Sequence, residues 1–120
     1  MSASTKTKDL SPQQVSAMLE KGRALLIDVR EPAEFGAERI HGALNFPLST
    51  FDPRALPQAG DRTIVFQCGS GKRSATAVER CRAHDLRFDS HLAGGISAWR
   101  AAGLPTVSFD PSTGAVRDAR

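Results

Sequence analysis

The most constraining feature of the chain is a nearly unbroken apolar run, Ala24–Val29, which only Asp28 interrupts. A second short run, Ile64–Phe66, has the same β-branched and aromatic character. Hydrophobicity that is continuous rather than alternating is typical of strands buried on both faces, as in parallel sheets covered by helices. The two runs therefore predict central strands of a sheet with two covered faces.

Helix signals alternate with these strands. Ser11 has the character of an N-cap, Pro12 suits the first helical position, Gln14 completes a capping box, and Gly22 ends this helix. Further helices are expected over residues 32–38, 74–83 and 96–102, and further strands over residues 40–46 and 90–92, with Thr63 beginning the central strand.

This alternation, without an internal repeat, predicts an α/β domain. We expect a doubly wound, mainly parallel sheet of about five strands with helices on both faces and right-handed crossovers. With 120 residues the chain holds one domain. We assign residues 1–8 to a flexible leader, 9–107 to the domain and 108–120 to a polar tail.

Composition excludes several classes of function. The net charge of +3 comes from 16 basic and 13 acidic residues spread along the chain, with one Trp and no Tyr, so we expect no nucleic-acid partner. No stretch approaches the roughly 20 apolar residues of a membrane span, so we expect no membrane association. Two cysteines without a secretion signal favour a reducing, cytoplasmic location.

The candidate nucleophile is Cys68, which closes the central strand and opens a loop leading into the helix at 74–83. Two glycines, Gly69 and Gly71, allow this loop to turn its N–H groups inward. The positive helix N-terminus and the side chains of Lys72 and Arg73 add favourable charge. All these features stabilise a thiolate over a thiol, and the thiolate is the reactive form of cysteine.

The same loop predicts an anion site. Its N–H groups, including that of Ser70, together with Lys72 and Arg73, suit a compact sulfur or phosphorus oxyanion. Four residues separate Cys68 from Arg73, one fewer than in the Cys-x5-Arg loop of cysteine phosphatases, and in that register Ser74 would occupy the arginine position. The smaller ring of amides suits a single sulfur atom on Cys68 better than a tetrahedral phosphate.

Three polar residues are expected to support the site from outside the loop's anion cradle: Asp28, Arg30 and Ser74. Asp28 lies near the carboxyl end of its strand, where ligands of parallel sheets bind, and it needs a partner such as Arg30 or the next loop's N–H groups. Asp28 and Arg30 either border the site or form an ion pair that only fixes the loop. We favour the ion pair.

The other cysteine and the histidines predict no further site. Cys81 is expected to be a buried small hydrophobe rather than a resolving thiol. His41, His84 and His91 are scattered without ligand spacing, so neither a metal nor another cofactor is expected.

Five motifs in order resemble a rhodanese domain. They are Asp28-Val29-Arg30-Glu31, Glu34-Phe35, Ile40-His41-Gly42-Ala43, the Cys68-Gly-Ser-Gly-Lys-Arg-Ser loop, and Leu92-Ala93-Gly94-Gly95-Ile96 with Trp99. The family often has His-Ile-Pro-Gly-Ala where this chain has Arg39-Ile40-His41-Gly42-Ala43. The resemblance implies a sulfurtransferase: the loop cysteine takes a sulfane sulfur from a small anionic donor such as thiosulfate. The resulting persulfide passes the sulfur to cyanide, a thiol or a protein.

Two alternatives remain open at this stage. One is a cysteine phosphatase or arsenate reductase that uses the same anion cradle. The other is a sulfur carrier or docking module that serves one protein partner.

Overall fold

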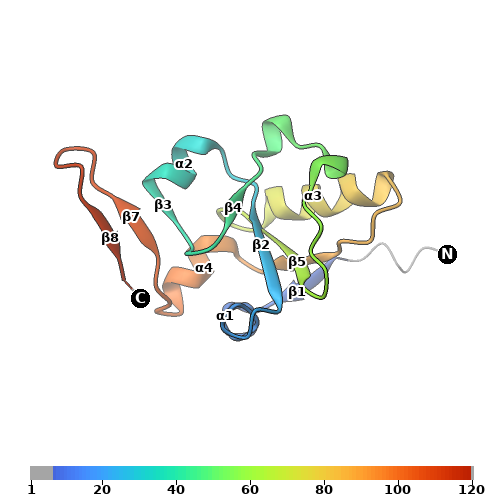
Figure 1. Ribbon diagram of the computed structural model, residues 1–120, viewed down its shortest axis with the longest axis horizontal. Coiled ribbons are helices and arrows are strands. Elements are labelled where there is room, and N and C mark those ends of the chain that lie inside the picture. Colours follow the sequence, from blue (N-terminus) through green and yellow to red (C-terminus); the bar gives the residue numbers. More distant parts are fainter. Residues whose placement is uncertain (1–6, 120) are drawn as a thin grey trace.

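The computed structural model describes residues 7–119 (Figure 1). Its main sheet has five parallel strands in the order β1-β6-β5-β2-β4, which confirms the predicted α/β class. The strands are β1 (Lys8–Leu10), β2 (Ala24–Asp28), β4 (Leu44–Asn45), β5 (Thr63–Gln67) and β6 (Ser90–Leu92). Residues 1–6 of the predicted leader lie outside the described range, whereas Lys8 already belongs to β1.

Within residues 7–119, four α-helices and two short 3-10 helices connect the strands. The α-helices are α1 (Pro12–Glu20), α2 (Pro32–Ala37), α3 (Lys72–Ala83) and α4 (Gly95–Ala101), and the 3-10 helices are η2 (Leu48–Thr50) and η3 (Pro53–Ala55). The expected capping box of α1 is present: Ser11 Oγ accepts from Gln14 N at 3.1 Å, and Gln14 Oε1 accepts from Ser11 N at 2.8 Å. No helix in the described range is long and apolar enough to cross a membrane.

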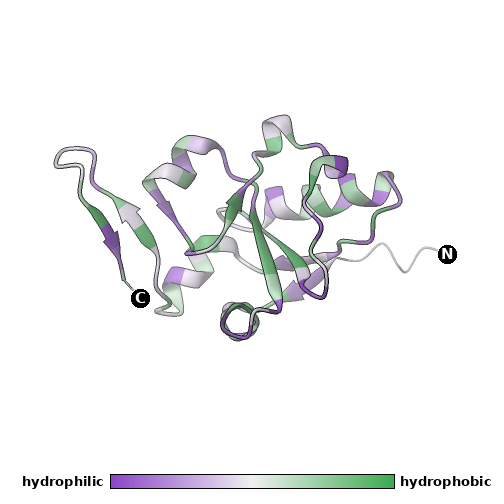
Figure 2. Ribbon diagram, in the orientation of Figure 1, coloured by the Kyte–Doolittle hydropathy of each residue, from purple (hydrophilic) through white to green (hydrophobic). Residues whose placement is uncertain are grey.

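The core lies in two layers, one on each face of the sheet. Leu26 and Val65 point to the face covered by α1 and α4, where Trp99 is buried. Ile27 and Phe66, the next residues along each strand, point to the face covered by α3. Because side chains alternate along a strand, the continuous apolar runs of β2 and β5 fill both layers, and these strands stand out as hydrophobic in Figure 2. Each large apolar side chain buried in this way contributes about 1.5–3 kcal/mol.

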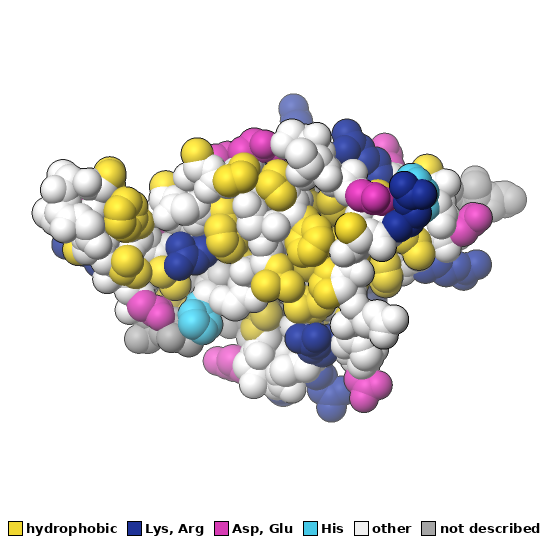
Figure 3. Space-filling model, turned by 45° about the horizontal axis from the view of Figure 1, so that its top comes forward, with side chains coloured by type: hydrophobic (Ala, Val, Ile, Leu, Met, Phe, Trp, Pro, Cys, Tyr) yellow, Lys and Arg dark blue, Asp and Glu magenta, His cyan; other side chains and the backbone are white. Residues whose placement is uncertain are grey.

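The chain beyond the main sheet differs from the polar tail assigned to residues 108–120. Strands β7 (Val107–Phe109) and β8 (Val116–Asp118) form an antiparallel hairpin, and β7 also pairs with β3 (Glu38–Arg39). Val107 is buried, while Phe109 and Val116 face each other across the hairpin and are exposed. The hairpin projects from one end of the molecule, and hydrophobic side chains are visible there in the surface view (Figures 1 and 3). Cross-strand pairing explains why this mostly polar segment forms strands.

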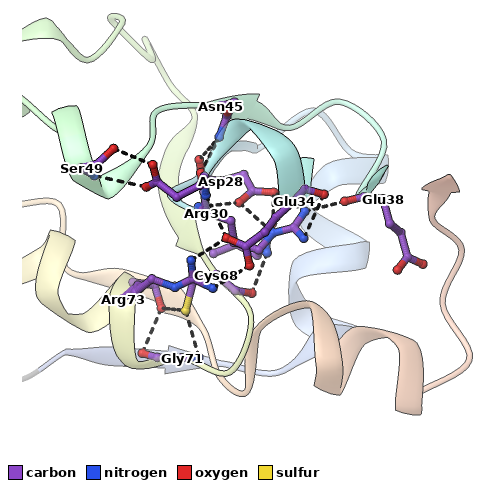
Figure 4. A network of polar contacts seen from close by, with 12 residues as sticks. Asp28, Arg30, Glu34, Glu38, Asn45, Ser49, Cys68, Gly71 and Arg73 are labelled. Atoms are coloured by element: carbon purple, nitrogen blue, oxygen red, sulfur yellow. Dashed lines mark hydrogen bonds and ion pairs between the residues drawn. The ribbon is translucent and has the colours of Figure 1, made fainter. Parts of the chain in front are cut away.

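A buried ion pair fixes the carboxyl end of β2. Asp28 is fully buried, and its carboxylate accepts bonds from the Arg30 backbone N–H at 2.9 Å and from the guanidinium Nη2 at 2.8 Å (Figure 4). The same guanidinium donates to the carbonyl oxygens of Glu34 at 3.4 Å and Glu38 at 2.6 Å. Arg30 thereby ties β2 to both ends of the segment that holds α2. This is the loop-fixing ion pair that the sequence favoured.

We predict that Asp28→Asn lowers the free energy of unfolding by about 3 kcal/mol, because it leaves the buried Arg30 charge uncompensated. Urea denaturation measures the loss. The control is Asp52→Asn, since Asp52 and Arg54 repeat the same Asp-x-Arg contacts on the surface, with the two side chains 46% and 73% exposed. This control should barely move the urea midpoint. Equal effects of the two substitutions would show that burial of the first pair is energetically unimportant.

Candidate active site

Cys68 lies directly after β5, at the carboxyl edge of the parallel sheet, as the sequence predicts. Its neighbours in the core are apolar residues of the α3 face, and only 1% of the residue is exposed. The side chain is held at the base of the loop that ends at Gly71, the residue before α3. The loop therefore starts on a rigid strand and ends on a rigid helix, which fixes the sulfur.

Polar groups of the loop and of α3 surround the Cys68 sulfur. The backbone N–H of Gly71 donates to Sγ at 3.0 Å (Figure 4). Ser74 Oγ lies 3.6 Å from Sγ. Burial raises the pKa of the Cys68 thiol, but hydrogen bonds from the Ser74 side chain and from backbone N–H groups of Ser74, Gly71 and Ser70 outweigh it. The pKa of Cys68 therefore lies below its ordinary value, which favours the nucleophilic thiolate.

The loop is shaped by close backbone contacts with α4. The N–H of Ile96 donates to the Cys68 carbonyl at 2.8 Å, and the N–H of Ser97 donates to the Gly69 carbonyl at 3.2 Å. Gly95 has φ +62°, and a Cβ at this position would collide with the Cys68 and Gly69 backbones. Only glycine fits, so the Gly94-Gly95 motif serves the Cys68 loop as well as the turn before α4.

The two cations of the loop are arranged differently. Arg73 makes a two-pronged ion pair with Glu34 of α2, with Nη1–Oε1 at 2.7 Å and Nη2–Oε2 at 3.0 Å (Figure 4). The hydrogen bonds from Arg73 to the Glu34 carboxylate hold the pKa of Glu34 at about 2. Lys72, at the start of α3, is exposed. The guanidinium of Arg73 lies beside the loop. A Cβ added at Gly69 would be 3.2 Å from Arg73 Nη2.

Two of the three residues expected behind the site do not contact the sulfur in this arrangement. Asp28 and Arg30 act on each other and on α2, and α2 in turn carries Glu34 to Arg73. Ser74 does reach the sulfur, and it is fully buried. Asp28 and Arg30 therefore shape the surroundings of the loop, whereas Ser74 contacts the Cys68 sulfur.

Sequence reasoning missed three residues around the site: Glu34 as the partner of Arg73, and His91 with Asp9 behind Ser74. His91 Nδ1 lies 2.8 Å from Ser74 Oγ, and its Nε2 lies 2.7 Å from an Asp9 carboxylate oxygen. A signal existed for His91, because it lies in the predicted strand 90–92, whose carboxyl end is at the same edge of the sheet as Cys68. No pattern marked Asp9, because β1 was not predicted.

The remaining cysteine and histidines lie apart from this cluster. Cys81 is fully buried, and burial raises the pKa of its thiol to about 11, which confirms its assignment as a core residue. His84 bonds the Arg80 carbonyl at the end of α3, and His41 lies 3.8 Å from Asp118. Among residues 7–119, no group of three or more His, Cys, Asp or Glu side chains is arranged to hold a metal ion.

Backbone amides at the carboxyl edge of a parallel sheet thus stabilise negative charge on the Cys68 sulfur. The comparison with known families is more specific: residues 11–102 match the rhodanese-like domain, and the chain belongs to this family.

Three similar proteins illustrate the relationship. An uncharacterised protein of Synechocystis is 41% identical over 108 residues, and the match covers 89% of this chain and 60% of that protein. The human thiosulfate:glutathione sulfurtransferase is 32% identical, with 75% of this chain and 90% of that protein covered. The crystal structure of a thiosulfate sulfurtransferase from Pseudomonas aeruginosa superposes with a TM-score of 0.74 over 83% of this chain and 20% of that one; at 22% identity this shows the shared fold.

We predict that Gly95→Ala displaces the Cys68 loop and lowers the alkylation rate of Cys68, because the added methyl group collides with the loop backbone. The control is Gly103→Ala, since Gly103 has a similar positive φ of +77° but no atom within 4 Å of the added carbon. Both variants carry the same type of backbone strain, so only the collision differs. An alkylation rate reduced equally in both would place the effect in backbone strain rather than in the contact with the loop.

Proposed function

We propose that the protein is a sulfurtransferase that moves a sulfane sulfur from thiosulfate or a similar small anionic donor to a thiol, cyanide or a protein acceptor. The observation that carries the proposal is the Gly71 N–H on the Cys68 sulfur inside a loop of only four residues between Cys68 and Arg73. Family membership and the sulfurtransferase among its relatives support the same class of reaction.

The reaction follows from the loop's geometry in two half-reactions. The Cys68 thiolate attacks the outer sulfur of thiosulfate, the sulfur–sulfur bond of the donor breaks with its electron pair, and sulfite leaves. The persulfide on Cys68 is then attacked at its outer sulfur by the acceptor, and the thiolate is regenerated. The N–H groups that hold the thiolate also stabilise the anionic persulfide, so the kinetics should be ping-pong.

Donor binding requires a change of partner at Arg73. Cys68 is only 1% exposed, so neighbouring atoms must shift before a donor reaches the sulfur. The Arg73–Glu34 ion pair is the more open part of the site, with side chains 36% and 40% exposed. A donor oxyanion replaces the Glu34 carboxylate on Arg73, and exposed Lys72 adds a second positive charge.

The decisive experiment is the intact mass of the reduced protein with and without thiosulfate. We expect a gain of about one sulfur atom, which cyanide or a thiol removes, because the mechanism requires a covalent persulfide. Cys68→Ser should gain nothing, whereas Cys81→Ala should gain the sulfur normally.

Other outcomes of this experiment point to other functions. No gain from thiosulfate or any other sulfur donor would overturn the proposal, and hydrolysis of a phosphate ester that depends on Cys68 would identify a phosphatase. A persulfide that forms but discharges only to one protein would identify a carrier.

We also predict that Arg73→Ala raises the KM for thiosulfate about tenfold or more, because a charge-assisted contact with the donor is lost. Steady-state kinetics measure the change. Arg80→Ala is the control, since it removes the same charge two turns further along α3, where Arg80 bonds the Leu48 carbonyl.

The partner residue gives a test in the opposite direction. Glu34→Gln weakens the hold on Arg73 and removes a negative charge that repels the donor, so the KM should fall. A rise in KM with Glu34→Gln, or equal effects of Arg73→Ala and Arg80→Ala, would place the donor's anion site elsewhere.

A further inference from the structure

A continuous chain of hydrogen-bonding groups runs from the Cys68 sulfur to the protein surface. Sγ lies 3.6 Å from Ser74 Oγ, this oxygen lies 2.8 Å from His91 Nδ1, and His91 Nε2 lies 2.7 Å from Asp9 Oδ1. Ser74 is fully buried and the His91 side chain is 9% exposed, whereas the Asp9 side chain is 71% exposed. The chain therefore leads from a buried nucleophile to solvent.

Three elements that are distant in sequence build this chain. Ser74 is on α3, His91 is on β6 and Asp9 is on β1. The parallel register pairs Asp9 with His91 and His91 with Phe66, two residues before Cys68. The strand order β1-β6-β5 thereby brings the Asp9 carboxylate beside the His91 imidazole, with Cys68 just past the end of the next strand.

The donor and acceptor capacities of these groups determine where the protons are. An ionised carboxylate only accepts, so the contact with Asp9 places a proton on His91 Nε2. In a neutral imidazole Nδ1 is then an acceptor, and it takes the single hydroxyl proton of Ser74. Ser74 Oγ in turn accepts from the Cys68 S–H, so in the thiol state each of the three contacts has one donor and one acceptor.

The thiolate state requires the opposite direction of donation. Ser74 can donate to the Cys68 thiolate only if its proton is not given to His91. That condition holds when Nδ1 carries a proton and donates to Ser74 Oγ, which makes His91 an imidazolium. The Ser74 contact with the Gly71 carbonyl at 3.1 Å competes for the same hydroxyl proton and does not replace this requirement.

We propose that Ser74, His91 and Asp9 form a proton relay for Cys68, in which His91 is the positioning residue that holds the thiol proton. The S–H bond of Cys68 breaks and its electron pair stays on sulfur. That proton passes to Ser74 Oγ while the Ser74 hydroxyl proton passes to His91 Nδ1, so the products are a thiolate and an imidazolium with unchanged total charge. Asp9 orients the imidazole and offsets its positive charge. The role in sulfur transfer rests on the proposed function, but the relay itself concerns only ionisation of Cys68.

The test is the pH dependence of Cys68 alkylation by iodoacetamide, followed in a Cys81→Ala background. We expect His91→Gln to raise the midpoint pH of Cys68 alkylation by about one pH unit or more, because a positive charge near the thiolate is lost. The limiting alkylation rate at high pH should stay unchanged. If His91 had only a structural role, its loss would lower this limiting rate as well as shift the midpoint. His84→Gln is the matched control, since His84 is exposed and bonds only a helix carbonyl.

The other charged groups near the relay make the sign of this shift clear. Asp9 on β1 contacts His91, and Arg73 on α3 interacts electrostatically with Cys68; the facing residues Phe66 on β5 and Ser74 on α3 do not titrate in this range. Arg73 is retained in His91→Gln, so the loss of the imidazolium alone sets the sign of the shift. Asp9→Asn should raise the midpoint in the same direction but less, because Asp9 is exposed.

A second measurement needs no substitution at His91, in case His91→Gln fails to fold. Nitrogen chemical shifts of the His91 ring should show the ring gaining its second proton as Cys68 becomes a thiolate. Alkylation of Cys68, or Cys68→Ser, should lower the pH at which His91 loses its proton, because coupling between two titrating sites is reciprocal.

The outcomes separate the relay from the proposed function. An unmoved alkylation midpoint in His91→Gln, or a His91 titration that is the same with and without the Cys68 thiolate, would overturn the relay. Absence of a persulfide in the mass experiment would overturn sulfur transfer and leave the alkylation result valid.

Discussion

The arrangement of the site depends on the buried ion pair between Asp28 and Arg30. A carboxyl group with no exposure needs hydrogen-bonding partners, and its neighbour Arg30 supplies both a guanidinium and a backbone N–H. The remaining donors of Arg30 bind carbonyl oxygens at 34 and 38, so the pair sets the position of α2. Glu34 then extends from α2 to Arg73, and the influence of one ion pair in β2 reaches the loop around the cysteine (Figure 4).

The loop itself is preorganised by backbone groups rather than by charged side chains. The Gly71 N–H points at the sulfur, and the first turn of α4 bonds the carbonyl oxygens on the outer side of the loop. Donors fixed in this way need no reorganisation when negative charge moves onto sulfur, which suits the proposed cycle of Cys68 between thiolate and persulfide. Arg73 beside the loop is already paired with Glu34, so the anionic donor that we propose would have to compete with this carboxylate.

The relay proposed for Ser74, His91 and Asp9 complements this backbone cradle. Amides stabilise the thiolate once it exists but cannot accept its proton, whereas an imidazole can. A buried sulfur has little direct contact with water, so a path that ends at exposed Asp9 gives the proton a route to solvent.

Much of this protein was determined by local sequence. Apolar runs, caps and glycines act over a few residues, and they predicted the strands β2 and β5, the capping box of α1, the place of Cys68 directly after β5 and the core position of Cys81. Only tertiary structure decided that Glu34 binds Arg73 39 positions away, that Asp9 meets His91 82 positions away, and that residues 107–118 form a hairpin. These contacts depend on strand order, register and close packing. Two polar side chains far apart in sequence carry no local pattern that predicts whether the sheet will place them side by side.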